Sequence, residues 1–481
     1  MAPSAPSTTP GFATFQKHLS TEPLESSIEY LVSLLKRRQI KGSKRCAVAT
    51  TILLLRTVEL TKQADSARLI QRVTEVGLQL IDAAPHEPAV GNIVRRVLGI
   101  IRDEDEDDQA ASRLNSPGYG SDPASEAVTP LEQPSSRMIP HSGTLSAFAA
   151  GTSPSPRVTS ARPALTTTLT GGQGLTRPAV TSMFSIISHP TMRFGGIDSP
   201  HSNRSGTATP QMTSSGHLSN LRPEVIKGIK EIVDEISAAD DEISAAALEQ
   251  IHPHETILTY SSSLTVQRFL LKAASKRKFT LIHVEAYPNN HTKTHAQITG
   301  NQEIASQDED NLPNDSFSKP LTSAGIQVIL VPDSAIFAVM SRANKVILDA
   351  HAVLTNGAIV ATAGTKSVIK AAQFHRVPVL VLAATFKLSP VHAYDPYTLM
   401  EYTDANKVVP YQDEELRSGL VQGPRNPLFD FVEPGQVDLF VTNQVPAVVS
   451  SGYLYRVVRD QYHDEDVDLR QHHHDRGDHE S

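Results

Sequence analysis

The chain has 481 residues, with 44 Lys and Arg against 52 Asp and Glu and a formal net charge of −8. At roughly 100–200 residues per domain, this length allows two or three domains. The acidic balance argues against sequence-independent DNA binding, which needs a basic surface. A single cysteine, Cys46, excludes a disulfide framework and a cysteine-based zinc site. No apolar run approaches the roughly 20 residues of a membrane helix, and no signal peptide is apparent, so we expect a cytosolic protein.

Residues 24–102 show the periodicity of amphipathic helices. Leu69, Val73, Val76 and Leu80 recur at spacings of three and four, which places them on one face of a helix. We therefore predict a helical domain over residues 24–102, preceded by a disordered N-terminus at residues 1–23.

The composition changes sharply after residue 102. Residues 103–108 are six consecutive acids, and the stretch that follows to residue 220 is rich in Ser, Thr, Pro and Gly. Such a segment buries too little apolar surface to offset its chain entropy. We predict a disordered insertion over residues 103–220 and expect helices at residues 221–253 to complete the helical domain.

From residue 254 the pattern alternates between strands and helices. We expect strands at 256–260, 278–285, 326–331, 346–349, 377–383 and 437–442, and helices at 264–275, 334–342, 367–375 and 447–461. Short Val, Ile and Leu runs between helices indicate a parallel sheet covered on both faces. The predicted fold class is α/β: an N-terminal helical domain, a long disordered insertion and a Rossmann-like parallel sheet domain over residues 254–465. A disordered His- and Asp-rich tail at residues 466–481 follows.

The sequence lacks the usual cofactor motifs. A dinucleotide site needs Gly-x-Gly-x-x-Gly after the first strand, where this chain has three serines, 261–263. The run at 364–367 (GTKS) resembles the end of a P-loop, but its spacing is wrong. We interpret it as a tight turn whose backbone N–H groups cap the next helix, and as the one candidate site for an anion. No cofactor, metal or catalytic residue is predicted.

One long run in the α/β half resembles a known family. It reads VPDSAIFAVMSRANKVILDAHAVLTNGAIVATAGTKSVIKAAQFHRVPVLVLAATFKLSP, over residues 331–390. It is similar to the family that comprises the alpha, beta and delta subunits of eukaryotic translation initiation factor 2B and two sugar-phosphate isomerases. The stretches DSAIFAVMSRANKVI, FKLSP, VGNIVRRVLGIIR and ALEQIH are similar to the beta branch.

The isomerases of that family allow a comparison residue by residue. Their first strand ends in Thr-His-Cys with a catalytic Cys, where this chain has Thr259, Tyr260 and Ser261. A Ser in this place lacks thiolate character.

The second isomerase motif is Asn-Gly-Asp followed by Asn-Lys-Ile-Gly-Thr, and its Asp is the acid/base. Here Asn356 and Gly357 remain but Ala358 stands for the Asp, and Gly364 and Thr365 remain while the Asn-Lys pair is lost. An alanine cannot transfer a proton. A fold that keeps its turns without its chemistry implies a binding role.

The resemblance implies a regulatory subunit of the factor that exchanges GDP for GTP on translation initiation factor 2. Alpha, beta and delta would form the regulatory core, with beta paired to delta. Gamma and epsilon would attach, and epsilon would carry the exchange activity. The core would sense phosphorylation of the alpha subunit of factor 2.

Two groups of residues are candidates for contacts with partners. Asn92, Arg95 and Arg96 lie on a basic helix that either contacts factor 2 or sister subunits, or is a solvated face. Small molecules bind in the family where beta meets delta, and the matching positions are His254, Thr280 and Ile282. The alternatives to a regulatory subunit are an active sugar-phosphate isomerase and a phosphometabolite sensor that uses the Gly364 turn.

Overall fold

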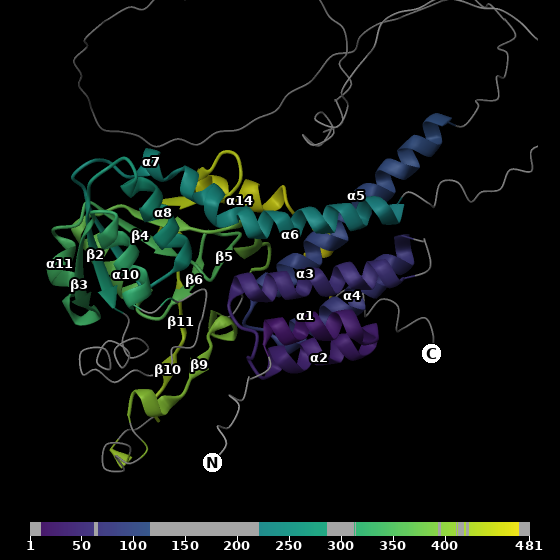
Figure 1. The fold of residues 1–481 in the computed structure, drawn as a ribbon, viewed down its shortest axis with the longest axis horizontal. Coiled ribbons are helices and arrows are strands. Elements are labelled where there is room, and N and C mark those ends of the chain that lie inside the picture. Colours follow the sequence, from purple (N-terminus) through teal and green to yellow (C-terminus); the bar gives the residue numbers. More distant parts are fainter. Residues whose placement is uncertain are drawn as a thin grey trace, which may run out of the picture. The chain divides into compact units, whose positions relative to one another are not determined.

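The computed structural model describes residues 11–61, 66–115, 221–285, 312, 314–392, 396–409, 411, 418–419 and 423–470. These residues belong to one compact unit, in which a layer of helices packs on an α/β layer (Figure 1). No helix in these ranges is both long and apolar enough to cross a bilayer.

The helical layer is built from six long helices. They are α1 (Phe12–Thr21), α2 (Leu24–Lys36), α3 (Ser43–Leu60), α4 (Ser66–Ala83), α5 (Pro88–Asn115) and α6 (Leu221–Ala245), and the short α7 (Ala247–Gln250) follows. The predicted stripe on α4 is confirmed, because Leu69, Val73, Val76 and Leu80 are all buried. Helix α6 packs against α3 and α5 on one side and against α8 of the α/β layer on the other, so one core spans both layers.

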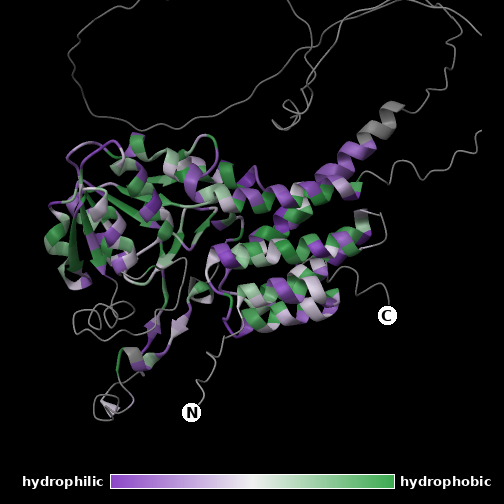
Figure 2. Ribbon diagram, viewed as in Figure 1, coloured by the Kyte–Doolittle hydropathy of each residue, from purple (hydrophilic) through white to green (hydrophobic). Residues whose placement is uncertain are grey.

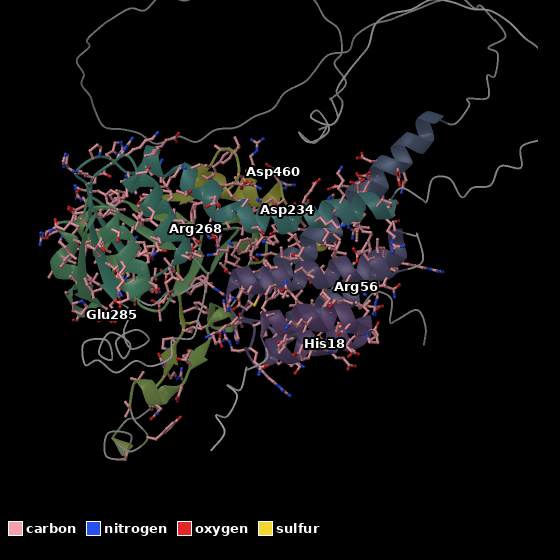
Figure 3. All side chains as sticks on the ribbon, in the orientation of Figure 1. His18, Arg56, Asp234, Arg268, Glu285 and Asp460 are labelled. Carbon is pink, nitrogen blue, oxygen red and sulfur yellow. The ribbon has the colours of Figure 1, made fainter. Side chains whose placement is uncertain are left out.

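Three of the predicted boundaries are wrong. Helix α1 lies inside the segment expected to be disordered, because Phe15 and Leu19 are buried and His18, which Figure 3 labels, stacks on Tyr30 with ring centroids 4.3 Å apart. Helix α5 continues through the acidic run, whose hydrophilic side chains colour it purple in Figure 2. Once its buried turns have nucleated the helix, adding further residues is easy.

The third wrong boundary is the predicted start of the disordered tail at residue 466. Asp466 and Leu469, which we placed in a disordered tail, are buried against the helical layer. Residues 471–481 of the predicted tail, and residues 116–220 of the predicted insertion, lie outside the described residues.

The main sheet has seven strands in the order β13-β12-β7-β4-β1-β2-β3. Their bounds are β1 (Thr256–Tyr260), β2 (Thr280–Glu285), β3 (Gln327–Pro332), β4 (Lys345–Asp349), β7 (Val379–Leu382), β12 (Leu439–Val441) and β13 (Val448–Ser450). All neighbours are parallel except β12 and β13, and Leu258 of β1 is opposite Ile282 of β2. The predicted parallel sheet is therefore confirmed, but the helix expected at 447–461 begins as the antiparallel strand β13.

Helices cover both faces of this sheet. On one face lie α8 (Leu264–Ala274) and α10 (Asn314–Ser323), and on the other lie α11 (Ile336–Met340), α12 (Thr365–His375) and α14 (Ser451–Arg459). Successive strand residues point to opposite faces. Accordingly Ile257 belongs to the first cluster of buried side chains and Leu258 to the second.

Two smaller sheets were not predicted. One has the order β11-β6-β5-β8, and the other is the ribbon of β9 and β10. Their strands are β5 (Ala352–Leu354), β6 (Ile359–Thr362), β8 (Leu388–Ser389), β9 (Tyr402–Thr403), β10 (Asn426–Pro427) and β11 (Phe429–Val432). Strands of two to four residues are too short to show periodicity in a sequence.

Candidate functional site

A cavity of about 160 Å³ lies at the carboxyl ends of β1 and β4. Ser261 and Ser263 reach it from β1, Asp349 and His351 from β4, and Lys387 from the turn that follows β7. The helical layer closes it with Arg38, Lys41, Gly42, Ser43 and Glu87. In α/β folds ligands bind at this end of the strands, so this is the candidate site.

Ser261 is held in an unusual backbone conformation. Its φ is +67°, which is rare for a residue other than glycine, and its N–H donates to the carbonyl of Val284 at 3.2 Å. Such strain concentrates at functional sites. The two serines that follow have side-chain partners: Ser262 Oγ lies 3.2 Å from His283 Nε2, and Ser263 Oγ donates to Asp349 Oδ2 at 2.8 Å.

Asp349 organises the middle of the cavity. It accepts a hydrogen bond from Ser263 Oγ at 2.8 Å and forms an ion pair with Lys387 Nζ at 2.8 Å. The side chain of Lys387 is 6% exposed, so the pair is shielded from water and holds the lysine in place.

Glu87 and His351 meet at the helical side of the cavity. Their side chains are 7% and 8% exposed, and Glu87 Oε2 lies 3.3 Å from His351 Nε2. Burial raises the pKa of Glu87 to about 7, and Arg38, at 3.9 Å, offsets this in part. The imidazole of His351 stacks on Phe429 with ring centroids 4.1 Å apart.

The predicted turn at the start of α12 is confirmed, and its N–H groups are already bonded. Gly364 has φ +101° and precedes the helix. The N–H groups of Gly364 and Lys366 donate to Asp430 Oδ2 at 2.7 and 3.1 Å. A side chain at Gly364 would collide with Tyr260, whose hydroxyl donates to the Ala363 carbonyl at 2.5 Å. The carboxylate of Asp430 thus takes the place in which we expected an anion, while Thr365 lines the cavity.

The Asn356–Ala358 part of the second isomerase-like motif lies outside the cavity wall. Asn356 and Gly357 form the turn between β5 and β6, where Asn356 Oδ1 accepts from the N–H of Ala358 at 2.9 Å and Gly357 has φ +81°. Ala358 is fully buried. The structure thus brings Ser261 and Thr365 to the cavity, places Gly364 against Tyr260, and leaves Asn356 and Gly357 with a structural role in the turn.

The candidate partner residues on α5 face the chain's own interior. Asn92 is fully buried and donates to the carbonyl of Phe386 at 3.0 Å. Arg95 donates to the carbonyl of Val467 at 3.2 Å, and Arg96 pairs with Glu235 of α6 at 3.1 Å. The solvated face is wrong for Asn92 and Arg95, because both side chains are buried and bonded within the chain, while contact with a partner stays a prediction.

His254 and Thr280 lie at the amino ends of β1 and β2, at the opposite end of the strands from Ser261, and Ile282 lies inside β2. His254 precedes β1 with φ +65° and its N–H donates to the carbonyl of Lys278 at 2.7 Å. Thr280 begins β2, and Ile282 is buried beneath α11 and α12. Only His254 and Thr280 are therefore accessible to solvent, and their contact with a partner or a small molecule stays a prediction.

Sequence reasoning missed most of the charged groups of the cavity. Arg38, Glu87, Asp349 and Lys387 are far apart in the chain, and the sequence shows no spacing that joins them. One signal was available for Asp349, because a polar residue at the carboxyl end of a buried parallel strand lies at the ligand-binding edge.

Together the fold and the cavity define a class: an α/β protein with a helical cap and a pocket at the carboxyl ends of its strands. The family model "Initiation factor 2 subunit family" matches residues 39–307 and 311–444. The chain belongs to this family.

Curated relatives and solved structures agree with this assignment. The chain is 30% identical over 465 residues to "Translation initiation factor eIF2B subunit beta" of Schizosaccharomyces pombe, covering 94% of this chain and 99% of the relative. It is 26% identical over 267 residues to "Ribose 1,5-bisphosphate isomerase" of Archaeoglobus fulgidus, covering 56% and 71%. The "tetrameric eIF2B-beta2-delta2 complex from C. thermophilum" contains a chain with 28% identity and a TM-score of 0.57, covering 94% and 100%.

Proposed function

We propose that this chain is the beta subunit of the exchange factor for translation initiation factor 2 and acts by regulating exchange. The observation that carries the proposal is the similarity to a beta subunit over nearly the full length of both chains. The isomerase relative matches a smaller share of this chain.

The partner within the factor is the delta subunit. A solved relative of this chain belongs to a tetrameric complex of two beta and two delta subunits. This chain exposes large apolar side chains on the layer of α11, α12 and α14: Phe337 is 54% exposed, Phe374 78% and Tyr455 53%. Exposed apolar side chains on one layer favour burial against another protein. The gamma and epsilon subunits and the alpha subunit of factor 2 complete the proposed partners, in the cytosol.

The site supports a role without catalysis. By the family resemblance, Ser261 stands in the place of the isomerase nucleophile and Ala358 in the place of the proton-transferring Asp, and Ala358 is buried and does not line the cavity. The alternative of a phosphometabolite sensor needed free backbone N–H groups at the start of α12. The N–H groups of Gly364 and Lys366 donate to Asp430 there, so this alternative loses its support.

Native mass spectrometry of the gently isolated, tagged chain tests the assignment. We expect one large complex that contains four other subunits. A lone chain or a homodimer would overturn the proposal. Turnover assays on ribose 1,5-bisphosphate and methylthioribose 1-phosphate test the runner-up, since isomerisation that is lost in Ser261→Ala would establish an enzyme instead.

A further inference from the structure

Two side chains stand between the Ser261 cavity and a second cavity of about 260 Å³. Arg38 and Glu87 line both cavities, so they form the wall that the two cavities share. Glu87 belongs to the turn between α4 and α5, and the second cavity extends from there to Leu35 and Ile40. The side chain of Glu87 is 7% exposed, so the carboxyl in this wall is shielded from water.

The shared wall also joins the two layers. Glu87 belongs to the helical layer, and its Oε2 lies 3.3 Å from Nε2 of His351, which follows β4 in the α/β layer. The His351 imidazole is itself buried and is held by stacking on Phe429. On the helical side, Glu87 accepts from the backbone N–H of Gly42 and lies 3.9 Å from Arg38. Movement of the Glu87 carboxyl out of the wall would therefore break contacts with both layers.

The charges around Glu87 do not balance when its carboxyl is ionised. Two cations face it, Arg38 and Lys387. Arg38 also pairs with Glu401, and Lys387 pairs with Asp349 at 2.8 Å. Two cations thus serve three carboxylates, and a proton taken up by Glu87 restores the balance. The other titratable groups at this corner are two imidazoles and two solvent-exposed lysines: His86, His351, Lys36 and Lys41.

Burial lets Glu87 hold that proton near neutral pH. Desolvation raises the pKa of Glu87 to about 7, although the neighbouring positive charges and the N–H of Gly42 lower it. Where the corner opens and water reaches the carboxyl, the pKa of Glu87 returns toward its ordinary value of 4.5. Opening therefore releases a proton, and it becomes more favourable as the pH rises from 4.5 to 7.

We propose that Glu87 is a pH-sensitive latch between the two layers and a gate between the two cavities. While it carries its proton, it stays in the shared wall beside Arg38 and His351. Once it is ionised, the wall opens locally more often, the two cavities join and water enters between the layers. The latch depends on contacts within the chain and not on the proposed role in nucleotide exchange.

Hydrogen exchange of the full chain, followed by mass spectrometry, measures the opening. The amides to follow are those of Gly42, which donates to Glu87, and of Glu87 and Val90, whose bonds hold the turn. Dividing the opening constant of the wild type by that of Glu87→Gln cancels the intrinsic pH dependence of exchange. This ratio should rise about tenfold from pH 6 to pH 8 and then level off, because the pKa of the carboxyl is about 7 when closed and 4.5 in water. A ratio that does not change with pH would overturn the proposal.

Urea distinguishes a local opening from unfolding of the whole chain. A local opening exposes little surface, so exchange at these amides should be unaffected by urea concentrations well below those that denature the chain. Exchange that accelerates with urea would mean that the corner opens only when the chain unfolds, and Glu87 would then be no latch.

The charge imbalance has a test of its own. Glu401→Gln leaves Arg38 to Glu87 alone, so two cations serve two carboxylates and Glu87 should ionise at a lower pH. In this background the ratio, with and without Glu87→Gln, should level off about 1 pH unit lower than in the wild type. Glu433→Gln is the matched control, because Glu433 is 59% exposed and pairs with Lys366 away from the corner, and its profile should equal that of the wild type. An unchanged profile in Glu401→Gln would contradict the imbalance on which the latch depends.

Discussion

The helical and α/β layers meet at two junctions, which differ in how completely their buried charged groups are paired. At the first junction, Arg95 of α5 donates to the Val467 carbonyl and Arg102 of α5 donates to Asp466. At the second, Glu87 and Glu401 share Arg38, and acceptors remain without hydrogen bonds. The first arrangement fixes the layers to each other. The second leaves a perturbed carboxyl and a cavity, which are the features of a binding site.

The largest expected loss in the free energy of unfolding follows a substitution at the first junction. Arg102 binds both oxygens of Asp466, whose side chain is 2% exposed, at 3.0–3.2 Å. Arg102→Met leaves this carboxylate buried without its main partner and should lower the free energy of unfolding by about 3–5 kcal/mol, measured by urea denaturation. The double variant Arg102→Met/Asp466→Leu should recover most of the loss. A loss below about 1 kcal/mol would show that the pair does not hold the layers together.

A substitution at the second junction should raise the free energy of unfolding instead of lowering it. The folded-state pKa of Glu87 is about 7 against an ordinary 4.5, so ionisation destabilises the folded chain. That penalty is absent below pH 4.5 and grows as the pH rises to 7, reaching about 3 kcal/mol. Glu87→Gln should therefore stabilise the chain at pH 8 by about 3 kcal/mol and have little effect at pH 4.5. Urea titrations at both pH values measure the difference, and a gain independent of pH would contradict it.

An uncharged hydrogen bond at the first junction should contribute less to the free energy of unfolding than the Arg102–Asp466 ion pair. Asn92→Ala removes the donor to the Phe386 carbonyl and should cost about 1–2 kcal/mol in unfolding free energy. The matched control is Gln71→Ala, because the Gln71 amide donates to Glu75 on an exposed face and its loss should be small. Equal effects of the two substitutions would show that Asn92 does not join the layers.

The smallest effect is expected at an ion pair that belongs to neither junction. Arg456 and Asp460 lie 3.9 Å apart with side chains 71% and 69% exposed. Arg456→Ala should change the unfolding free energy by no more than about 0.5 kcal/mol, because water and salt screen an exposed pair. A larger loss in urea denaturation would mean that burial does not set the ranking of these effects.

Much of the fold could be predicted from local pattern. The buried stripe of α4 and the strand β1, which begins and ends where predicted, follow from apolar spacing alone. The antiparallel strand β13 could not be found in this way, because its three residues follow the helical pattern of α14 and become a strand only by pairing with β12. Of the residues that line the candidate site, only Ser261 and Thr365 were predicted, because both stand in short motifs with recognisable sequence.

Residue type and short-range spacing were enough to predict the α/β class and the helical layer, and the family resemblance implied that Ser261 and Ala358 stand in the place of two isomerase groups. Long-range packing was needed to show that the arginines of α5 face inward, that Asp430 bonds to the start of α12, and that Glu87 is buried beside Arg38 and His351. These outcomes depend on contacts between residues far apart in the chain. The free energy of a buried charge is set by the partners that folding brings to it.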